Sequence, residues 1–234
     1  MEELARKLDD IVGYGVVHDI FEAEETSAIL MFTGQNAEAI NKATFGGFFG
    51  ELQRILGQTL QLSVTRMFES QKTYPLRSIP AALNFLKENC GNIPVLDRSA
   101  LIRALQKLGH DGEASKRLSD QDLTLTVATA FSRELERLQN VAGTAIKTIR
   151  DKVIAHRERI AEDSLRRATY AQIDELIEYA KDVTTAIGQG YTGVGYRVDG
   201  GEYYLTADAE RAVRSLQRLL TAARVVIKPS DASL

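Results

Sequence analysis

The chain has 234 residues, which is enough for one large domain with a buried core, and its formal net charge of −3 excludes a surface that is basic throughout. Its one cysteine, Cys90, excludes a disulfide framework or a cysteine-rich zinc site within one chain and fits a reducing, cytoplasmic compartment. The N-terminus does not resemble a secretory signal, and no window approaches the roughly 18 uninterrupted apolar residues of a membrane span, so we expect no contact with a membrane.

Helical spacing of apolar residues dominates the first third of the chain. One apolar stripe runs through Glu2–Phe21, and we expect a second helical piece at Thr26–Phe32. The stretch Ala37–Ser70 predicts one long helix or two stacked helices, and its second half is apolar around most of its circumference, as is typical of a central helix. Arg66 interrupts this apolar surface, so we expect it to be buried and held by a carboxylate or by several carbonyl groups, as a structural hydrogen-bond anchor.

Capping residues mark the helices of the rest of the chain. Ser78 and Asp97 precede short helical patterns, Gly109 closes the second of them, and Thr169 with Gln172 forms a capping box. His110-Asp111-Gly112 predicts a turn. The expected helices are Ser78–Glu88, Asp97–Leu108, a long region from Ser119 as far as Asp163 with a joint at Gly143, Tyr170–Ile187, and Thr206–Val226.

The sequence changes character after residue 187. The segment GQGYTG contains the glycine spacing of a dinucleotide site but lacks the strand before it and the helix after it, so we interpret it as a loop. Asp199-Gly200-Gly201 lies between two short alternating runs and predicts a β-hairpin with strands at Gly195–Val198 and Glu202–Leu205. We therefore predict one all-α domain over residues 1–234, a helical bundle with a small hairpin at 195–205 before the last helix.

Groups able to do chemistry are concentrated in Lys147–Asp163, where Arg150 is followed by Asp151 and, after five intervening residues, by His156. Histidine titrates near neutral pH and can take a proton from a ribose 2′-hydroxyl or give one to a leaving oxygen. Arginine stabilises the negative charge that develops on a phosphorane. Together they suffice for metal-independent cleavage of RNA, while DNA lacks the required hydroxyl.

The spacing of this motif constrains its geometry. On a straight helix Arg150 and His156 point about 120° apart, whereas Lys152 and His156 share a face. Arg150 and His156 therefore converge only if a helix starts or kinks within the motif, or if a two-fold dimer brings both copies into one cleft.

Local charge favours a phosphate ligand. Residues 147–167 contain seven Lys or Arg against four Asp or Glu, a net charge of +3 in a chain of −3. The spacing alone is not diagnostic, because Arg103 and His110 lie at a similar separation. The chain offers neither paired helical histidines nor Glu-x-x-His, so we expect no metal and no cofactor. The candidate phosphate-binding residues are Lys147, Lys152, Arg157 and Arg159.

The sequence IRDKVIAHRE, residues 149–158, resembles the signature of the HEPN superfamily, and its details are similar to the abortive-infection, AbiU2-like branch. The stretches LSVTRMFES and SIPAALNFL resemble core helices of that branch, and the resemblance extends over Leu60–Tyr179. It implies a helical bundle, a homodimer whose motifs meet at the interface, and a metal-independent ribonuclease of antiphage defence or of a toxin–antitoxin pair with a protein inhibitor. In that family pattern Arg150 binds the phosphate, His156 is the general acid and base, and Asp151 orients one of them.

Two other interpretations remain open. The same fold can serve as a non-catalytic module that binds nucleotide, RNA or a partner protein, because fold does not fix function. Alternatively, Arg150, Asp151 and His156 form a solvated charged face of an unrelated bundle.

Overall fold

A computed structural model describes residues 2–70, 75–138, 140, 169–197, 202–204 and 206–226. Within these residues the chain is helical apart from turns and short connections, so the predicted all-α helical class is confirmed. The helices are α1 (Glu2–Ile11), the π-helix η1 (Val12–Val16), α2 (Val17–Gln35), α3 (Ala37–Lys42), α4 (Gly46–Phe68), α5 (Ile79–Asn89), α6 (Arg98–Lys107), α7 (Gly112–Lys116), α8 (Asp120–Leu138), α10 (Tyr170–Ile187), the π-helix η5 (Gly188–Thr192) and α11 (Thr206–Ala222).

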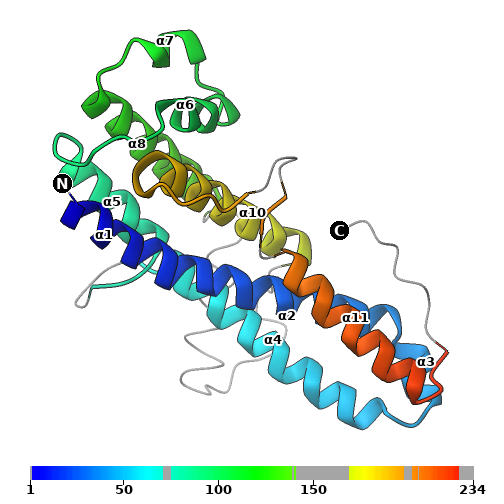
Figure 1. Cartoon of the computed structure of the whole chain (residues 1–234). Helices are drawn as coiled ribbons and strands as arrows, with labels where there is room; N and C mark the ends of the chain where they lie inside the picture. The colour runs from blue at the N-terminus through cyan, green and yellow to red at the C-terminus, as the bar shows by residue number, and fades with distance from the viewer. Residues whose placement is uncertain are drawn as a thin grey trace.

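The helices gather toward two ends of an elongated bundle (Figure 1). The long helices α2 and α4 run side by side, and α11 packs on α2 near the end where α3 lies. At the other end α5 and α6 pack against α8, and α7 packs against α6. Helix α10 contacts α2, α4 and α6 and so links the two groups.

The first three elements form one continuous helix with a π-helical turn in its middle. The predicted stripe is buried and recurs every four residues, at Leu8, Val12, Val16 and Ile20. In a regular α-helix each such step drifts about 40° around the axis. The wider turn η1 takes up an extra residue and returns the stripe to the core side.

The stretch predicted as one long or two stacked helices is two helices, α3 and α4. They are separated by a turn in which Thr44 has a φ of 66°, a left-handed conformation that ends a helix. Arg66 on α4 donates to Asp19 of α2 at 2.8 Å and also pairs with Glu22. The predicted pairing of Arg66 is confirmed, although its side chain is half exposed because the carboxylates lie at the edge of the α2–α4 contact.

The predicted caps are present. Ser78 and Asp97 accept backbone N–H bonds at the starts of α5 and α6, and Thr169 with Gln172 forms the capping box of α10. The turn predicted at 110–112 instead includes the cap of a short helix, because the Asp111 carboxylate accepts the Glu113 N–H at 2.9 Å and starts α7. We predict that the helix from Ser119 extends as far as Asp163 with a joint at Gly143. That joint and the extension lie outside the described residues.

Three expectations for the C-terminal part need correction. The loop predicted at GQGYTG is the π-helical turn η5, which continues α10 and ends at Gly193 with a φ of 73°. No strand occurs among the described residues; in place of the predicted hairpin, Arg197 and Tyr203 form one antiparallel bridge, and the side chains of both residues point into polar contacts with α10. The last helix ends at Ala222 rather than Val226, because Arg224 has a φ of 61°.

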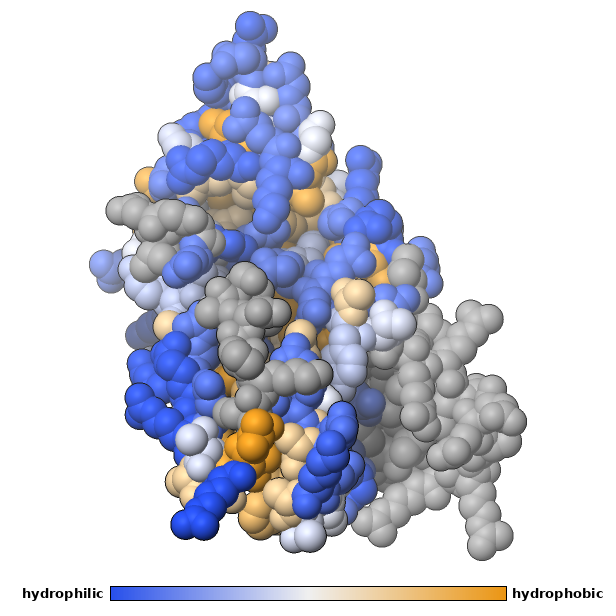
Figure 2. Space-filling view, turned by 90° about the vertical axis from the view of Figure 1, so that its right-hand side faces the viewer, coloured by the Kyte–Doolittle hydropathy of each residue, from blue (hydrophilic) through white to orange (hydrophobic). Residues whose placement is uncertain are grey.

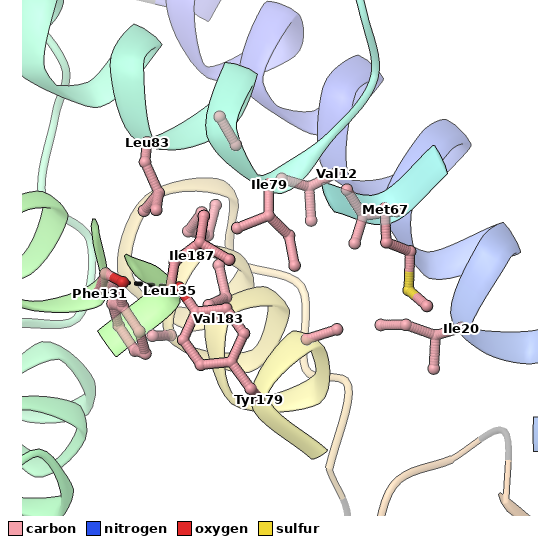
Figure 3. Packing of buried hydrophobic residues seen from close by; sticks show 14 of the residues in the cluster. Val12, Ile20, Met67, Ile79, Leu83, Phe131, Leu135, Tyr179, Val183 and Ile187 are labelled. Atoms are coloured by element: carbon pink, nitrogen blue, oxygen red, sulfur yellow. Dashed lines mark hydrogen bonds between the residues drawn. The ribbon is translucent and has the colours of Figure 1, made fainter. Parts of the chain in front are cut away.

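Two clusters of buried side chains hold these elements together. The larger cluster joins α1, α2, α4, α5, α6, α8 and α10, and Figure 3 shows Val12, Met67, Ile79, Phe131 and Ile187 converging within it. The smaller cluster packs α11 against α2, α3 and α4 through Phe32, Ile40, Phe49 and Val213. On the face drawn in Figure 2, hydrophilic residues predominate and apolar ones gather mainly toward the lower end. Within the described part of the chain, no helix combines the length and the apolarity needed to cross a membrane.

Candidate functional site

The residues predicted to cleave RNA lie in the segment between α8 and α10. All three candidate catalytic residues and all four candidate phosphate-binding residues fall outside the described residues, so their relative positions remain predictions. They are Arg150, Asp151 and His156, with Lys147, Lys152, Arg157 and Arg159.

The helices that flank this segment are described, and their ends lie side by side. Arg137 in the last turn of α8 donates to Glu175 in the first turns of α10 at 2.8 Å. Further along the same two helices, the Tyr179 hydroxyl donates to the Phe131 carbonyl at 2.7 Å, and the two rings pack edge to face. The helices therefore run antiparallel, and the C-terminal end of α8 lies beside the N-terminal end of α10.

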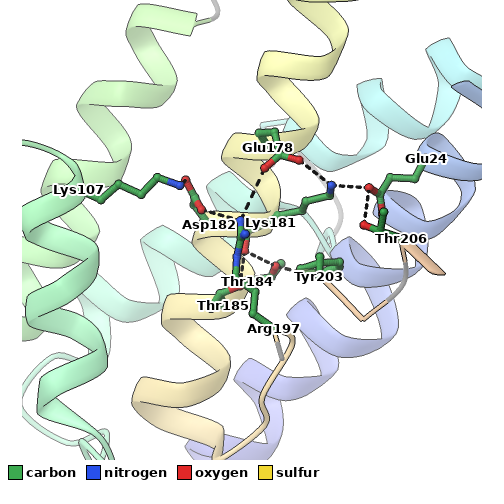
Figure 4. Close-up of polar contacts among 10 residues, drawn as sticks. All are labelled: Glu24, Lys107, Glu178, Lys181, Asp182, Thr184, Thr185, Arg197, Tyr203 and Thr206. Carbon is green, nitrogen blue, oxygen red and sulfur yellow. Dashed lines mark hydrogen bonds and ion pairs between the residues drawn. The ribbon is translucent and has the colours of Figure 1, made fainter. Parts of the chain in front are cut away.

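A polar cluster crosses the middle of α10 (Figure 4). Lys181 is only 6% exposed, and a buried ammonium group is stable only when anions surround it. It pairs with Glu24 of α2 and, at 2.6 Å, with Glu178 one turn earlier on α10. Its ammonium group also lies 5.7 Å from the centre of the Tyr203 ring, within the range of a cation–π contact.

Hydroxyl groups extend this cluster toward α11. Thr206 donates to Glu24 at 3.1 Å, and the hydroxyls of Thr184 and Tyr203 lie 3.1 Å apart. Burial raises the pKa of Tyr203 well above its usual value of 10, so its phenol stays protonated at neutral pH. Tyr203 therefore contributes a neutral hydroxyl and an aromatic face rather than a base.

The neighbouring face of α10 carries a second cluster around Asp182, the residue that follows Lys181. This carboxylate accepts Arg197 at 2.9 Å and pairs with Lys107 of α6 at 2.5 Å. Lys107 and Arg197, together with Arg103, line a cavity of about 240 Å³ between α6 and α10. Its charge favours an anion, but both Lys107 and Arg197 are already held by Asp182.

These arrangements can bind charge. The described part of the chain contains no group of three or more His, Cys, Asp or Glu residues placed to hold a metal ion. Sequence reasoning missed Glu24, Lys181 and Arg197. The available signal was Lys181 itself, which falls on the buried stripe of α10 between Ile177 and Thr184.

Comparison with known proteins identifies a family. The family model HEPN_AbiU2, described as AbiU2, matches residues 6–213. No curated protein and no solved structure matches the chain. The matched region contains every helix from α2 to α10 and the segment with Arg150 and His156, which agrees with the resemblance noted in the sequence. The chain belongs to the AbiU2 family of the HEPN superfamily.

Proposed function

We propose that the protein is a metal-independent endoribonuclease that acts in antiphage defence or in a toxin–antitoxin pair. The observation that supports this most directly is the intact trio of Arg150, Asp151 and His156 within the region, residues 6–213, that matches the family. Histidine, arginine and an acidic neighbour can cleave a phosphodiester next to a ribose without a metal ion.

In the proposed reaction His156 takes the proton of the ribose 2′-hydroxyl. The 2′-oxygen then forms a bond to phosphorus while the bond from phosphorus to the 5′-oxygen breaks. Arg150 stabilises the phosphorane charge, and Asp151 orients the arginine or the histidine. The leaving 5′-oxygen receives a proton, so the products are a 2′,3′-cyclic phosphate and a 5′-hydroxyl. Lys147, Lys152, Arg157 and Arg159 hold the flanking phosphates.

The active form in this proposal is a homodimer in which each chain is one domain over residues 1–234. Because Arg150 and His156 point about 120° apart on a straight helix, a two-fold axis through the motif offers a way to bring the two groups together. RNA is the substrate, a protein inhibitor restrains the activity, and the cytoplasm is the compartment.

The test is incubation of the purified protein with RNA in the presence of a chelator. We expect cleavage that leaves 2′,3′-cyclic ends and that is lost in His156→Ala and in Arg150→Ala. His110→Ala is the matched control, since His110 is exposed and follows another arginine, Arg103, with six residues between them. Cleavage that survives His156→Ala, or that requires a metal ion, would falsify the mechanism.

The same assay separates the second candidate function from the first. A protein that binds RNA or nucleotide with saturation but leaves it intact is a non-catalytic module of the same fold. The cavity of about 240 Å³ between α6 and α10 supports this second candidate, because Arg103, Lys107 and Arg197 line it.

A further inference from the structure

A second cavity, of about 440 Å³, lies between α2, α10 and the start of α11. That volume is in the range of sites for small molecules. Acidic residues outnumber basic ones on its wall, because only Lys181 and Arg197 oppose five carboxylates. The five are Glu24, Asp174, Glu178, Glu202 and Glu210.

Glu210 pairs with Arg214 at 2.9 Å, and the ion pairs among the described residues leave Asp174 and Glu202 of this wall without a salt bridge. Lys181 is shared by Glu24 and Glu178, and Arg197 pairs with Asp182 at 2.9 Å and only loosely with Glu178 at 3.6 Å. Partial desolvation and the nearby Glu178 raise the pKa of Asp174, as expected where carboxylates crowd together.

Within the part of the chain that the structure describes, two buried polar atoms on the wall also lack a hydrogen-bond partner. They are the Oγ of Ser27, a residue that is 6% exposed, and the second carboxylate oxygen of Glu24, whose side chain is 10% exposed. Buried acceptors of this kind cost free energy unless a donor reaches them. Both residues line the cavity from α2, so a donor placed at the α2 wall is the natural way to satisfy them.

The wall already shows how it holds an ammonium group. Lys181 places its amine between two carboxylates and over the Tyr203 ring (Figure 4). Between the polar residues on the same two helices, Ala28, Met31 and Ile177 add an apolar lining that suits a short hydrocarbon stem. A bare metal ion fits less well, since no group of three metal-binding side chains is present among the described residues.

We propose that this cavity binds an aliphatic amine, with its ammonium group facing Glu24, Ser27 and Asp174 and its stem against the apolar wall. The amine is either a free diamine or the side chain of a lysine in another protein. This site is separate from the proposed ribonuclease motif, and amine binding does not depend on cleavage of RNA.

Isothermal titration with 1,4-diaminobutane tests the proposal, beside a second titration with the peptide acetyl-Gly-Lys-Gly-amide. We expect saturable binding with a dissociation constant in the millimolar range or tighter for at least one of them. Binding of the diamine alone indicates a free amine, and binding of the peptide alone indicates a lysine side chain. The ribonuclease variant His156→Ala should bind equally well.

Two surface carboxylates of the cavity provide variants that should fold. The double variant Asp174→Asn with Glu202→Gln should weaken binding at least about fivefold, since one charge at contact distance in water contributes about 1 kcal/mol. The control Glu113→Gln with Glu136→Gln removes the same charge from exposed sites on α7 and α8 outside the cavity and should leave binding unchanged. Four results would overturn the proposal: no saturable binding of either probe, equal loss in both double variants, the same heat from sodium chloride at matched ionic strength, or binding of magnesium with displacement of the amine.

Discussion

At the scale of single residues, paired charges connect helices that are distant in the sequence. Lys181 is the clearest case, because its buried amine joins α10 to α2 through Glu24. Asp19 of α2 is the second case, because it is only 6% exposed and pairs with Arg66 of α4. For each of these residues the cost of burial and the gain from pairing can be separated by experiment.

The variant Lys181→Met should lower the free energy of unfolding by about 3–5 kcal/mol, because Glu24 is left buried without a cation. Removing both charges, in Lys181→Met with Glu24→Leu, should recover most of that loss. Lys116→Met is the matched control: its lysine makes an exposed contact with Glu113, worth under about 0.5 kcal/mol. Urea denaturation measures all four proteins, and a double variant no more stable than the single one would contradict the assignment.

Asp19 predicts a pH effect with a definite sign. Burial raises its pKa above the ordinary 3.8 despite the opposing contact with Arg66, so the folded state holds this proton more tightly than the unfolded state. The contribution of Asp19 to stability is then fully present below pH 3.8 and is lost as the pH rises through the folded pKa. The free energy of unfolding of Asp19→Asn, compared with that of the wild type, should therefore increase as the pH rises from acid to neutral.

Denaturation of both proteins across that pH range measures the difference. If the stability of Asp19→Asn relative to the wild type instead falls toward neutral pH, the ion pair with Arg66 outweighs the cost of burying Asp19.

At the scale of elements, two helical glycines differ in the space around them, and alanine substitutions test that difference. A Cβ at Gly15 in η1 would overlap the Cβ of Arg77 and lie 2.9 Å from its carbonyl oxygen, so Gly15→Ala should destabilise the protein by about 1–3 kcal/mol. Gly57 lies inside α4 with nothing within 4 Å of such a Cβ, and Gly57→Ala should stabilise it by about 0.5–1 kcal/mol. Thermal unfolding distinguishes the two, and a destabilised Gly57→Ala would show that α4 is packed more tightly there than described.

Elements defined by local chemistry could be predicted from the sequence. Ser78, Asp97 and Thr169 each offer a side-chain oxygen to the first turn of a helix, which depends only on neighbouring residues. The π-helical turns could not be assigned from glycines alone, because glycine is as common in loops. The four-residue repeat from Leu8 to Ile20 was the better signal for η1, since a regular helix does not keep such a stripe on one face.

At the scale of the whole molecule, the proposed dimer predicts complementation. If arginine and histidine act across the two-fold axis, Arg150→Ala and His156→Ala subunits form mixed dimers with one complete site. Mixing the two inactive proteins after mild dissociation should restore up to about a quarter of wild-type cleavage, as random pairing of a two-fold dimer predicts. A mixture that stays inactive, although mixed dimers form, would indicate that both groups act within one chain.

The molecule's family could be recognised from the sequence, whereas its polar cluster could not. The segment IRDKVIAHRE pointed to the branch that the match over residues 6–213 then identified. The partners of Lys181 come from α2 and from the chain after α10, and such long-range neighbours follow from helix packing rather than from local pattern. The same holds for the cavity with Ser27, whose wall exists only once three helices meet.

The π-helical turn η1 also limits how this chain can change in length. Because η1 holds one residue more than a regular turn, a single deletion within Val12–Val16 would turn it into α-helix without breaking the helix. The same deletion would leave Leu8 on the core side, because the remaining residues of regular α-helix return it to within about 20° of Ile20. Variants that lose a single residue before α2 are therefore expected to lose it within Val12–Val16 and to carry a regular helical turn there, whereas other changes in length before α2 should come in whole turns of three or four residues.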